Sequence, residues 1–160
     1  MILNFYRLIS DIMFIPVLIY FLSRILLAKE NITSVMEKFC WSEKKRPHGK
    51  LVWINAVSVG EAKTGIIIAK KLKKNNPNVV ILLSTSTLTS YNLLSKDKKN
   101  DFLLIFSPLD INLIVKKFVK KWQPNLTIFI ESEIWPNIFY RLNKKQIKLK
   151  LFNARISEKS

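Results

Sequence analysis

Cysteine, histidine and glycine are scarce in this chain of 160 residues, and each shortage excludes a class of site. With Cys40 as the only cysteine, an intrachain disulfide and any zinc or iron–sulfur site that needs several thiolates are excluded. With His48 as the only histidine, a site of two imidazoles is excluded as well. The three glycines form neither a P-loop nor a glycine-rich dinucleotide motif. We therefore expect none of these sites, and we predict no cofactor.

Acidic residues are also few, since 11 Asp and Glu stand against 27 Lys and Arg, for a formal net charge of +16. Such a charge suits nucleic acid, anionic lipid or a phosphorylated substrate, and it also arises when lysines simply solvate helix surfaces. No aromatic RNA-binding motif accompanies the lysine clusters, so we expect no nucleic-acid partner. Hydrophobic residues make up 49% of the chain, which excludes intrinsic disorder and suffices for one domain with a core.

The N-terminal segment is strongly apolar, and the residues from Ile12 to Leu22 carry no charge. A membrane span needs about 20 apolar residues, and a flanking side chain such as Arg7 can reach the interface. We therefore predict a hydrophobic membrane-anchoring helix at residues 1–27. Asp11 and Pro16 are unfavourable in a deep span, so an anchor in the headgroup plane and a buried core helix both remain open.

The next segment, residues 28–50, is basic and holds six Lys and Arg against three Glu. A positive excess beside an apolar segment is typical of the cytoplasmic side of a membrane. We predict a basic connecting segment here and a cytoplasmic domain at residues 51–160.

From residue 51 onward, short apolar runs alternate with amphipathic ones. The pattern predicts strands at 51–56, 79–84, 102–106, 126–130 and 147–152. It predicts helices at 61–74, 87–94 and 111–122 and after Pro136, with Asp110 as the cap of the third. One helix between consecutive strands implies right-handed βαβ units, so the predicted fold class is α/β, a Rossmann-like parallel sheet.

Ligands bind such sheets at the carboxyl ends of the strands, so the loops after the strands are the candidate site. These loops gather hydroxyls, carboxylates, an arginine and a tryptophan, and they comprise residues 57–61, 84–87, 107–110, 131–137 and 153–157. The helices carry mostly lysine instead. Loops are polar in general, but this concentration of reactive side chains indicates a site at one edge of the sheet.

Several of these segments carry motifs of a known family. Trp53–Glu61, Glu131–Asn137 and Asn153–Ser157, together with Glu37–Phe39 and Ser107–Asp110, resemble the 3-deoxy-D-manno-octulosonic acid (Kdo) transferases of lipopolysaccharide synthesis. The motifs follow in the same order, and the resemblance covers nearly the whole chain, including the apolar N-terminus.

The resemblance implies an inverting, membrane-associated glycosyltransferase of the GT-B type, whose two Rossmann-like domains face each other across a cleft. Its reaction transfers Kdo from CMP-Kdo to the lipid A precursor (lipid IVA) on the cytoplasmic side of the inner membrane, without a metal. This chain corresponds to the N-terminal, acceptor-binding half. We expect the C-terminal donor-binding domain to be missing, and we expect no transfer by this chain alone.

Two residues depart from the family pattern. Asn55 stands where the family usually has histidine, and asparagine keeps hydrogen bonding but cannot carry a proton at neutral pH. Ser132 stands where threonine is usual, which is a mild change.

Glu61 is the predicted general base, because sugar transfer to a hydroxyl needs a group that removes the proton as the new bond forms. The preceding Gly60 allows a sharp backbone turn and a close approach to a ligand. From its position alone, Glu61 also fits a residue that merely complements a helix dipole.

The other candidates bind or support the acceptor: Ser58, Gly60, Glu131, Glu133, Trp135, Asn137, Asn153 and Arg155. Ser58 and Gly60 offer a hydroxyl and backbone N–H groups at a helix N-terminus, which is a natural anion site. Trp135 either stacks on a sugar or packs in the core. The guanidinium of Arg155 can pair with a phosphate of the acceptor or with the carboxylate of Glu133.

Three functions are compatible with the sequence. The first is the acceptor half of a Kdo transferase. The second is a truncated, catalytically inactive membrane-bound module that binds the acceptor lipid or a partner chain. The third and weakest is a basic nucleic-acid binder, whose affinity would fall steeply with salt.

Overall fold

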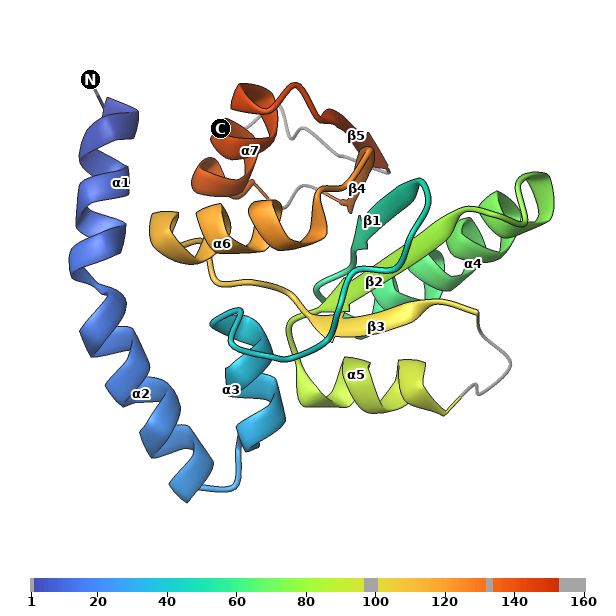
Figure 1. Ribbon diagram of the computed structural model, residues 1–160. Helices are drawn as coiled ribbons and strands as arrows, with labels where there is room; N and C mark the ends of the chain where they lie inside the picture. The colour runs from blue at the N-terminus through green and yellow to red at the C-terminus, as the bar shows by residue number, and fades with distance from the viewer. Residues whose placement is uncertain (1, 97–100, 132–133, 153–160) are drawn as a thin grey trace, which may run out of the picture.

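A computed structural model describes residues 2–96, 101–131 and 134–152, and a parallel β-sheet forms its centre (Figure 1). The strands are β1 (Leu51–Asn55), β2 (Val80–Thr85), β3 (Leu103–Phe106), β4 (Leu126–Ile130) and β5 (Lys148–Phe152). Their order is β3-β2-β1-β4-β5 and all neighbours are parallel, which confirms the predicted α/β class. The strand order reverses between β1 and β4, so the candidate site belongs at the carboxyl ends of these two strands.

Helices cover both faces of the sheet, which explains the continuous apolar runs of its strands. On one face lie α4 (Val59–Asn75) and α5 (Leu88–Ser95), and on the other lie α6 (Asn112–Trp122) and α7 (Pro136–Lys144) (Figure 1). In β1, Val52 and Ile54 pack under α4, whereas Leu51 and Trp53 belong to the core under α6. The Trp53 ring lies 4.6 Å from the ring of Phe118 of α6, centroid to centroid.

The N-terminal segment contains two helices where one was predicted. They are α1 (Ile2–Ile12) and α2 (Phe14–Leu26), which meet at an angle of 47°. The break has a local cause, because Pro16 lacks the N–H that would bond to the Ile12 carbonyl and its ring clashes with that carbonyl. Among the described residues, no single helix is long and apolar enough to cross a membrane, and the bent pair reaches that length and composition only when taken together. The prediction of a single helix is therefore wrong, and membrane anchoring remains a prediction.

One side of α1 and α2 is attached to the domain and the other is exposed. Only Ser10 of α1 and Phe21 of α2 are buried, so the two helices are not core helices. The exposed apolar side chains include Ile2, Phe5, Leu8, Ile12, Ile15, Ile19, Leu22 and Leu26. Figure 1 shows the pair as a bent rod along the outside of the domain.

The cap predicted for α6 is wrong. The carboxylate of Asp110 accepts hydrogen bonds from the N–H groups of Asn137 and Ile138, at 3.1 and 2.9 Å, so it caps α7. The start of α6 is capped from α1, where Asp11 Oδ1 accepts from the Leu113 N–H at 3.0 Å. Both caps are tertiary contacts between segments far apart in the chain, which a local sequence pattern does not reveal.

The basic segment 28–50 contains a further helix, α3 (Ile32–Lys38), and much of its charge is paired. Lys38 Nζ lies 2.5 Å from Glu30 Oε1, and Lys44 Nζ lies 2.6 Å from Glu37 Oε1. Burial lowers the pKa of Lys38, although the hydrogen bond to Glu30 opposes this shift. The first pair lies within the segment, whereas Lys44 Nζ also donates to the Leu104 carbonyl of β3 at 2.7 Å and so connects the segment to the sheet.

Candidate functional site

Glu61, the predicted base, lies in the first turn of α4 with only 4% of its surface exposed. Its carboxylate Oε2 accepts a hydrogen bond from the Val57 N–H at 2.9 Å. Its own N–H donates to Oγ of Ser58, the N-cap residue, at 3.2 Å. The pair of contacts is a variant of the capping box, in which a glutamate three residues after the N-cap bonds back to the backbone. The carboxylate is thereby fixed at the carboxyl end of β1.

The loop after β1 is also tied to β2. The Ala56 N–H donates to the Ser84 carbonyl at 2.9 Å, and Thr85 Oγ1 donates to the Val57 carbonyl at 3.2 Å. Val57 thus bonds Glu61 through its N–H and β2 through its carbonyl. The backbone that orients the Glu61 carboxylate is itself anchored to the sheet.

The three residues that precede Glu61 are open to solvent, since Ser58, Val59 and Gly60 are all exposed. Gly60 lies within α4, so the sharp turn expected at this glycine is not present. A Cβ atom at Gly60 would meet only Ser58 Oγ, at 3.9 Å. This glycine therefore provides clearance beside the N-terminus of α4, where backbone N–H groups and the helix dipole favour an anionic group.

Asn55, the residue that departs from the family pattern, is 1% exposed at the end of β1. Its Oδ1 accepts hydrogen bonds from Ser84 Oγ at 2.8 Å and from Ser107 Oγ at 2.6 Å. Ser84 Oγ in turn accepts from Trp53 Nε1 at 2.7 Å. This network joins the ends of β1, β2 and β3. Its side chains are neutral and do not ionise at neutral pH. Sequence reasoning missed Ser84 and Ser107 as partners; their only signal was a polar residue near the end of an apolar strand.

Glu131 follows β4 and is exposed, with φ of +63° in the left-handed region. For a residue other than glycine this conformation costs about 1 kcal/mol, and it persists only where the surroundings hold it. Here the Glu131 N–H donates to the Phe152 carbonyl of β5 at 2.8 Å. Asn55, the last residue of β1, pairs with Phe129 of β4, so Val57 and Glu131 both lie just beyond the carboxyl ends of these neighbouring strands. Glu131 and the loop that orients Glu61 therefore flank the point where the strand order reverses.

Asn137 and Trp135 are held by the domain itself. Asn137 is 2% exposed, and its Nδ2 donates to the Asp110 carbonyl at 2.5 Å and to Ser10 Oγ at 3.1 Å. Trp135 is half-buried and packs against the core shared by α6 and α7. Beside Asp110, the pKa of Tyr6 is raised to about 12, mainly by desolvation and secondly by the charge of Asp110. These contacts fix α7 and the edge of the site, and a role in acceptor binding remains a prediction.

Three predicted site residues, Glu133, Asn153 and Arg155, lie outside the described residues, as does Ser132. In the part of the chain that the structure describes, no group of three His, Cys, Asp or Glu could hold a metal ion. Burial raises the pKa of Cys40 to about 12, which keeps its thiol protonated and unreactive.

Comparison with known proteins identifies relatives over most of the chain. The family model described as 3-deoxy-D-manno-octulosonic-acid transferase (kdotransferase) matches residues 33–160. A 3-deoxy-D-manno-octulosonic acid transferase of Rickettsia bellii is 35% identical over 157 residues, which are 96% of this chain and 37% of the relative. A probable mitochondrial 3-deoxy-D-manno-octulosonic acid transferase of Arabidopsis thaliana is 33% identical over 131 residues, 82% of this chain and 29% of the relative. The chain thus spans only about a third of the length of these curated relatives.

Proposed function

This chain belongs to the family of Kdo transferases, and we propose that it forms the part of such an enzyme that binds the acceptor and carries the general base. The proposed reaction transfers Kdo from CMP-Kdo to the lipid A precursor, lipid IVA, in lipopolysaccharide synthesis. One observation carries the proposal: the buried Glu61 carboxylate is fixed at the carboxyl end of β1, beside the exposed first turn of α4.

In the proposed mechanism, Glu61 accepts the proton of the acceptor hydroxyl. A carboxylate offers about four lone-pair sites, so the bond from the Val57 N–H leaves it able to accept a second donor. As the acceptor oxygen forms a bond to the anomeric carbon of Kdo, the proton moves to Glu61. The bond from that carbon to the phosphate oxygen breaks on the opposite side, and CMP leaves with the electron pair. The configuration at the anomeric carbon is inverted.

The N-terminus of α4 and Glu131 are proposed to position the acceptor. Gly60 leaves room at the start of α4, where the exposed residues Val59 and Gly60 carry N-terminal N–H groups of the kind that bind a phosphate. Glu131 lies across the reversal point on the neighbouring strand, where its carboxylate can accept hydrogen bonds from sugar hydroxyls. CMP-Kdo is proposed to bind a second domain that faces this edge of the sheet.

The exposed apolar side of α1 and α2 supports a position at the inner membrane. Arg7, Ser10 and Asp11 bond to residues at the start of α6 or α7, which fixes the polar side of α1 against the domain. The apolar side chains then face outward, as in helices that lie in the headgroup plane. The proposed anchor is therefore interfacial, with the domain on the cytoplasmic side and the acyl chains of the acceptor in the same membrane.

The test measures Kdo transfer from CMP-Kdo to lipid IVA by this chain alone and by this chain fused to the remainder of the Rickettsia bellii relative. We expect transfer only by the fusion, and we expect it to be lost in the Glu61→Gln fusion. A Glu61→Gln fusion that transfers Kdo at the full rate would refute the assignment of the base. A fusion that binds lipid IVA without transferring Kdo would favour an inactive acceptor-binding module.

A further inference from the structure

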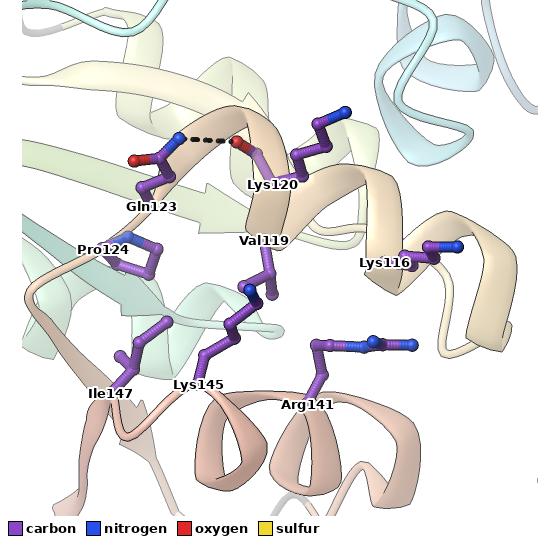
Figure 2. A pocket seen from close by; sticks show the side chains of 8 residues that line it. All are labelled: Lys116, Val119, Lys120, Gln123, Pro124, Arg141, Lys145 and Ile147. Atoms are coloured by element: carbon purple, nitrogen blue, oxygen red, sulfur yellow. Dashed lines mark hydrogen bonds between the residues drawn. The ribbon is translucent and has the colours of Figure 1, made fainter.

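The groove between α6 and α7 is a second candidate site, with a volume of about 520 Å³ (Figure 2). Four cationic side chains line it: Lys116 and Lys120 from α6, Arg141 from α7, and Lys145, which directly follows α7. In Figure 2, Arg141 of α7 and Lys145 at the end of that helix reach toward the space below α6. Among the residues that the structure describes, no carboxylate lines the groove.

These cations lack acidic partners within the described part of the chain, where none of the four takes part in an ion pair. Arg141 donates instead to a neutral oxygen, Asn112 Oδ1, at 3.2 Å. The guanidinium of Arg7 donates to the same oxygen at 3.1 Å. Two guanidinium groups thus converge on the Asn112 amide, whose Nδ2 donates in turn to Asp11 Oδ2 at 2.8 Å. An anion bound in the groove, beside Arg141 and the three lysines, would relieve the mutual repulsion of these four cations.

The walls of the groove are apolar, because Val119, Pro124 and Ile147 contribute to its lining. A groove that combines cations with apolar walls suits a phosphate group attached to a larger molecule better than it suits a free, fully hydrated anion.

The groove is separate from the proposed transfer site. Pro124 and Ile147 precede β4 and β5, so the groove reaches the amino ends of these strands. Glu61 and Glu131 lie at the carboxyl ends of the sheet. A strand of five residues spans about 16 Å, so a phosphate in the groove is not the reacting part of the acceptor.

We propose that the groove between α6 and α7 binds a phosphate-bearing ligand. The headgroup of an anionic phospholipid and a soluble diphosphate share this chemistry. The site does not depend on Kdo transfer, since no residue of the transfer site contributes to it.

The test compares two triple variants of the full chain with equal charge. The groove variant carries Lys116→Gln, Lys120→Gln and Lys145→Gln, and all three lysines are exposed. The control variant carries the same changes at Lys63, Lys71 and Lys74, which are exposed on α4 across the sheet. Each variant loses three positive charges without disturbing the core, and circular dichroism verifies that both are folded. General attraction of anions to a basic protein weakens equally in the two variants.

Two ligands are measured at 150 mM KCl. Calorimetry in detergent measures the affinity for inorganic pyrophosphate, and co-sedimentation measures binding to phosphatidylglycerol vesicles relative to phosphatidylcholine vesicles. We expect the groove variant to bind at least one of the two about tenfold more weakly than the wild type, and the control less than about twofold more weakly. A loss confined to the vesicles identifies a lipid headgroup as the ligand, and a loss that includes pyrophosphate shows that the phosphate alone suffices. Equal losses in the two variants, or no binding to either ligand, would overturn the proposal.

Discussion

The Val57 amide nitrogen lies 2.9 Å from the Glu61 carboxylate oxygen Oε2, so the loop that leaves β1 and the first turn of α4 hold each other in place. The same carboxylate is the proposed general base. We therefore propose two roles for Glu61, one in the fold and one in the chemistry, and suitable substitutions separate them.

Glutamine at position 61 preserves the structural role and removes the chemical one. Its amide oxygen can still accept the hydrogen bond from Val57, so we expect Glu61→Gln to change the free energy of unfolding by less than about 1 kcal/mol. Alanine loses this bond and leaves space at a buried position, so we expect Glu61→Ala to destabilise the chain by about 1–3 kcal/mol. Denaturation of both variants in urea gives the comparison. Equal stability of the two would show that the Val57–Glu61 contact does not stabilise the fold.

Gly60 and Gly65 in α4 are predicted to respond in opposite ways to the same change. At Gly60 a Cβ enters open space, so Gly60→Ala keeps or raises stability, by up to about 1 kcal/mol, while it weakens acceptor binding. At Gly65 a Cβ would lie 3.0 Å from Leu83 Cδ1 in the core, so Gly65→Ala destabilises by about 1–3 kcal/mol. Thermal unfolding and lipid IVA binding are measured on both variants. Unchanged lipid binding by Gly60→Ala would contradict a ligand at the N-terminus of α4.

The secondary structure of the sheet was predictable because a parallel sheet covered on both faces leaves continuous apolar runs such as Leu51–Asn55. All five predicted strands are present, with bounds that differ by at most one residue. Contacts between distant segments were not predictable. Asp110 lies just before α6 in the sequence and was predicted to cap it. In the fold, its carboxylate accepts hydrogen bonds from the first turn of α7 instead.

The pairing of charges in the basic segment 28–50 was not predictable either. Lys38 and Lys44 look like part of a juxtamembrane excess, but folding places them beside Glu30 and Glu37. For the candidate site, the loops could be predicted because the carboxyl ends of parallel strands meet at one edge. The bond from Val57 to Glu61 and the bonds from two serines to Asn55 depend on how the loops fold back, which spacing alone does not specify.

Cys40 is predicted to make the chain less stable in alkali. Burial raises the pKa of its thiol from 9.0 to about 12, against the opposing charge of Lys121. Between these pH values the unfolded chain loses the proton and the folded chain keeps it, so stability falls as the pH rises, by up to about 1.4 kcal/mol per pH unit. Below pH 9 the thiol is protonated in both the folded and the unfolded chain, so its stabilising contribution is fully present. Urea unfolding of wild type and Cys40→Ala from pH 8 to 11 isolates it, because the difference between their stabilities should shift against the wild type above pH 9. A constant difference would contradict the raised pKa.

The exposed isoleucines of α2 are predicted to bind the membrane. Ile15 and Ile19 are 65% and 62% exposed, one helical turn apart. Burial of such a side chain in an apolar phase contributes about 1.5–3 kcal/mol, so Ile15→Gln with Ile19→Gln should weaken binding to neutral phosphatidylcholine vesicles at least about tenfold. Ile67→Gln is the matched control, because Ile67 is 67% exposed on α4. An equal loss of binding in the control would argue against α2 as the anchor.

The role of Glu61 as the base is tested most directly by single-turnover Kdo transfer in the fusion, with Glu61 and with Glu61→Gln, at saturating lipid IVA and CMP-Kdo. Removal of a general base lowers the rate of the chemical step by about 10²–10⁴-fold. We predict a rate loss in this range for Glu61→Gln, with the Kd for lipid IVA changed less than about threefold, since the fold and the hydrogen bond to Val57 persist. A variant that keeps the wild-type rate would contradict the assignment, and Glu61 would then serve only to hold the loop after β1.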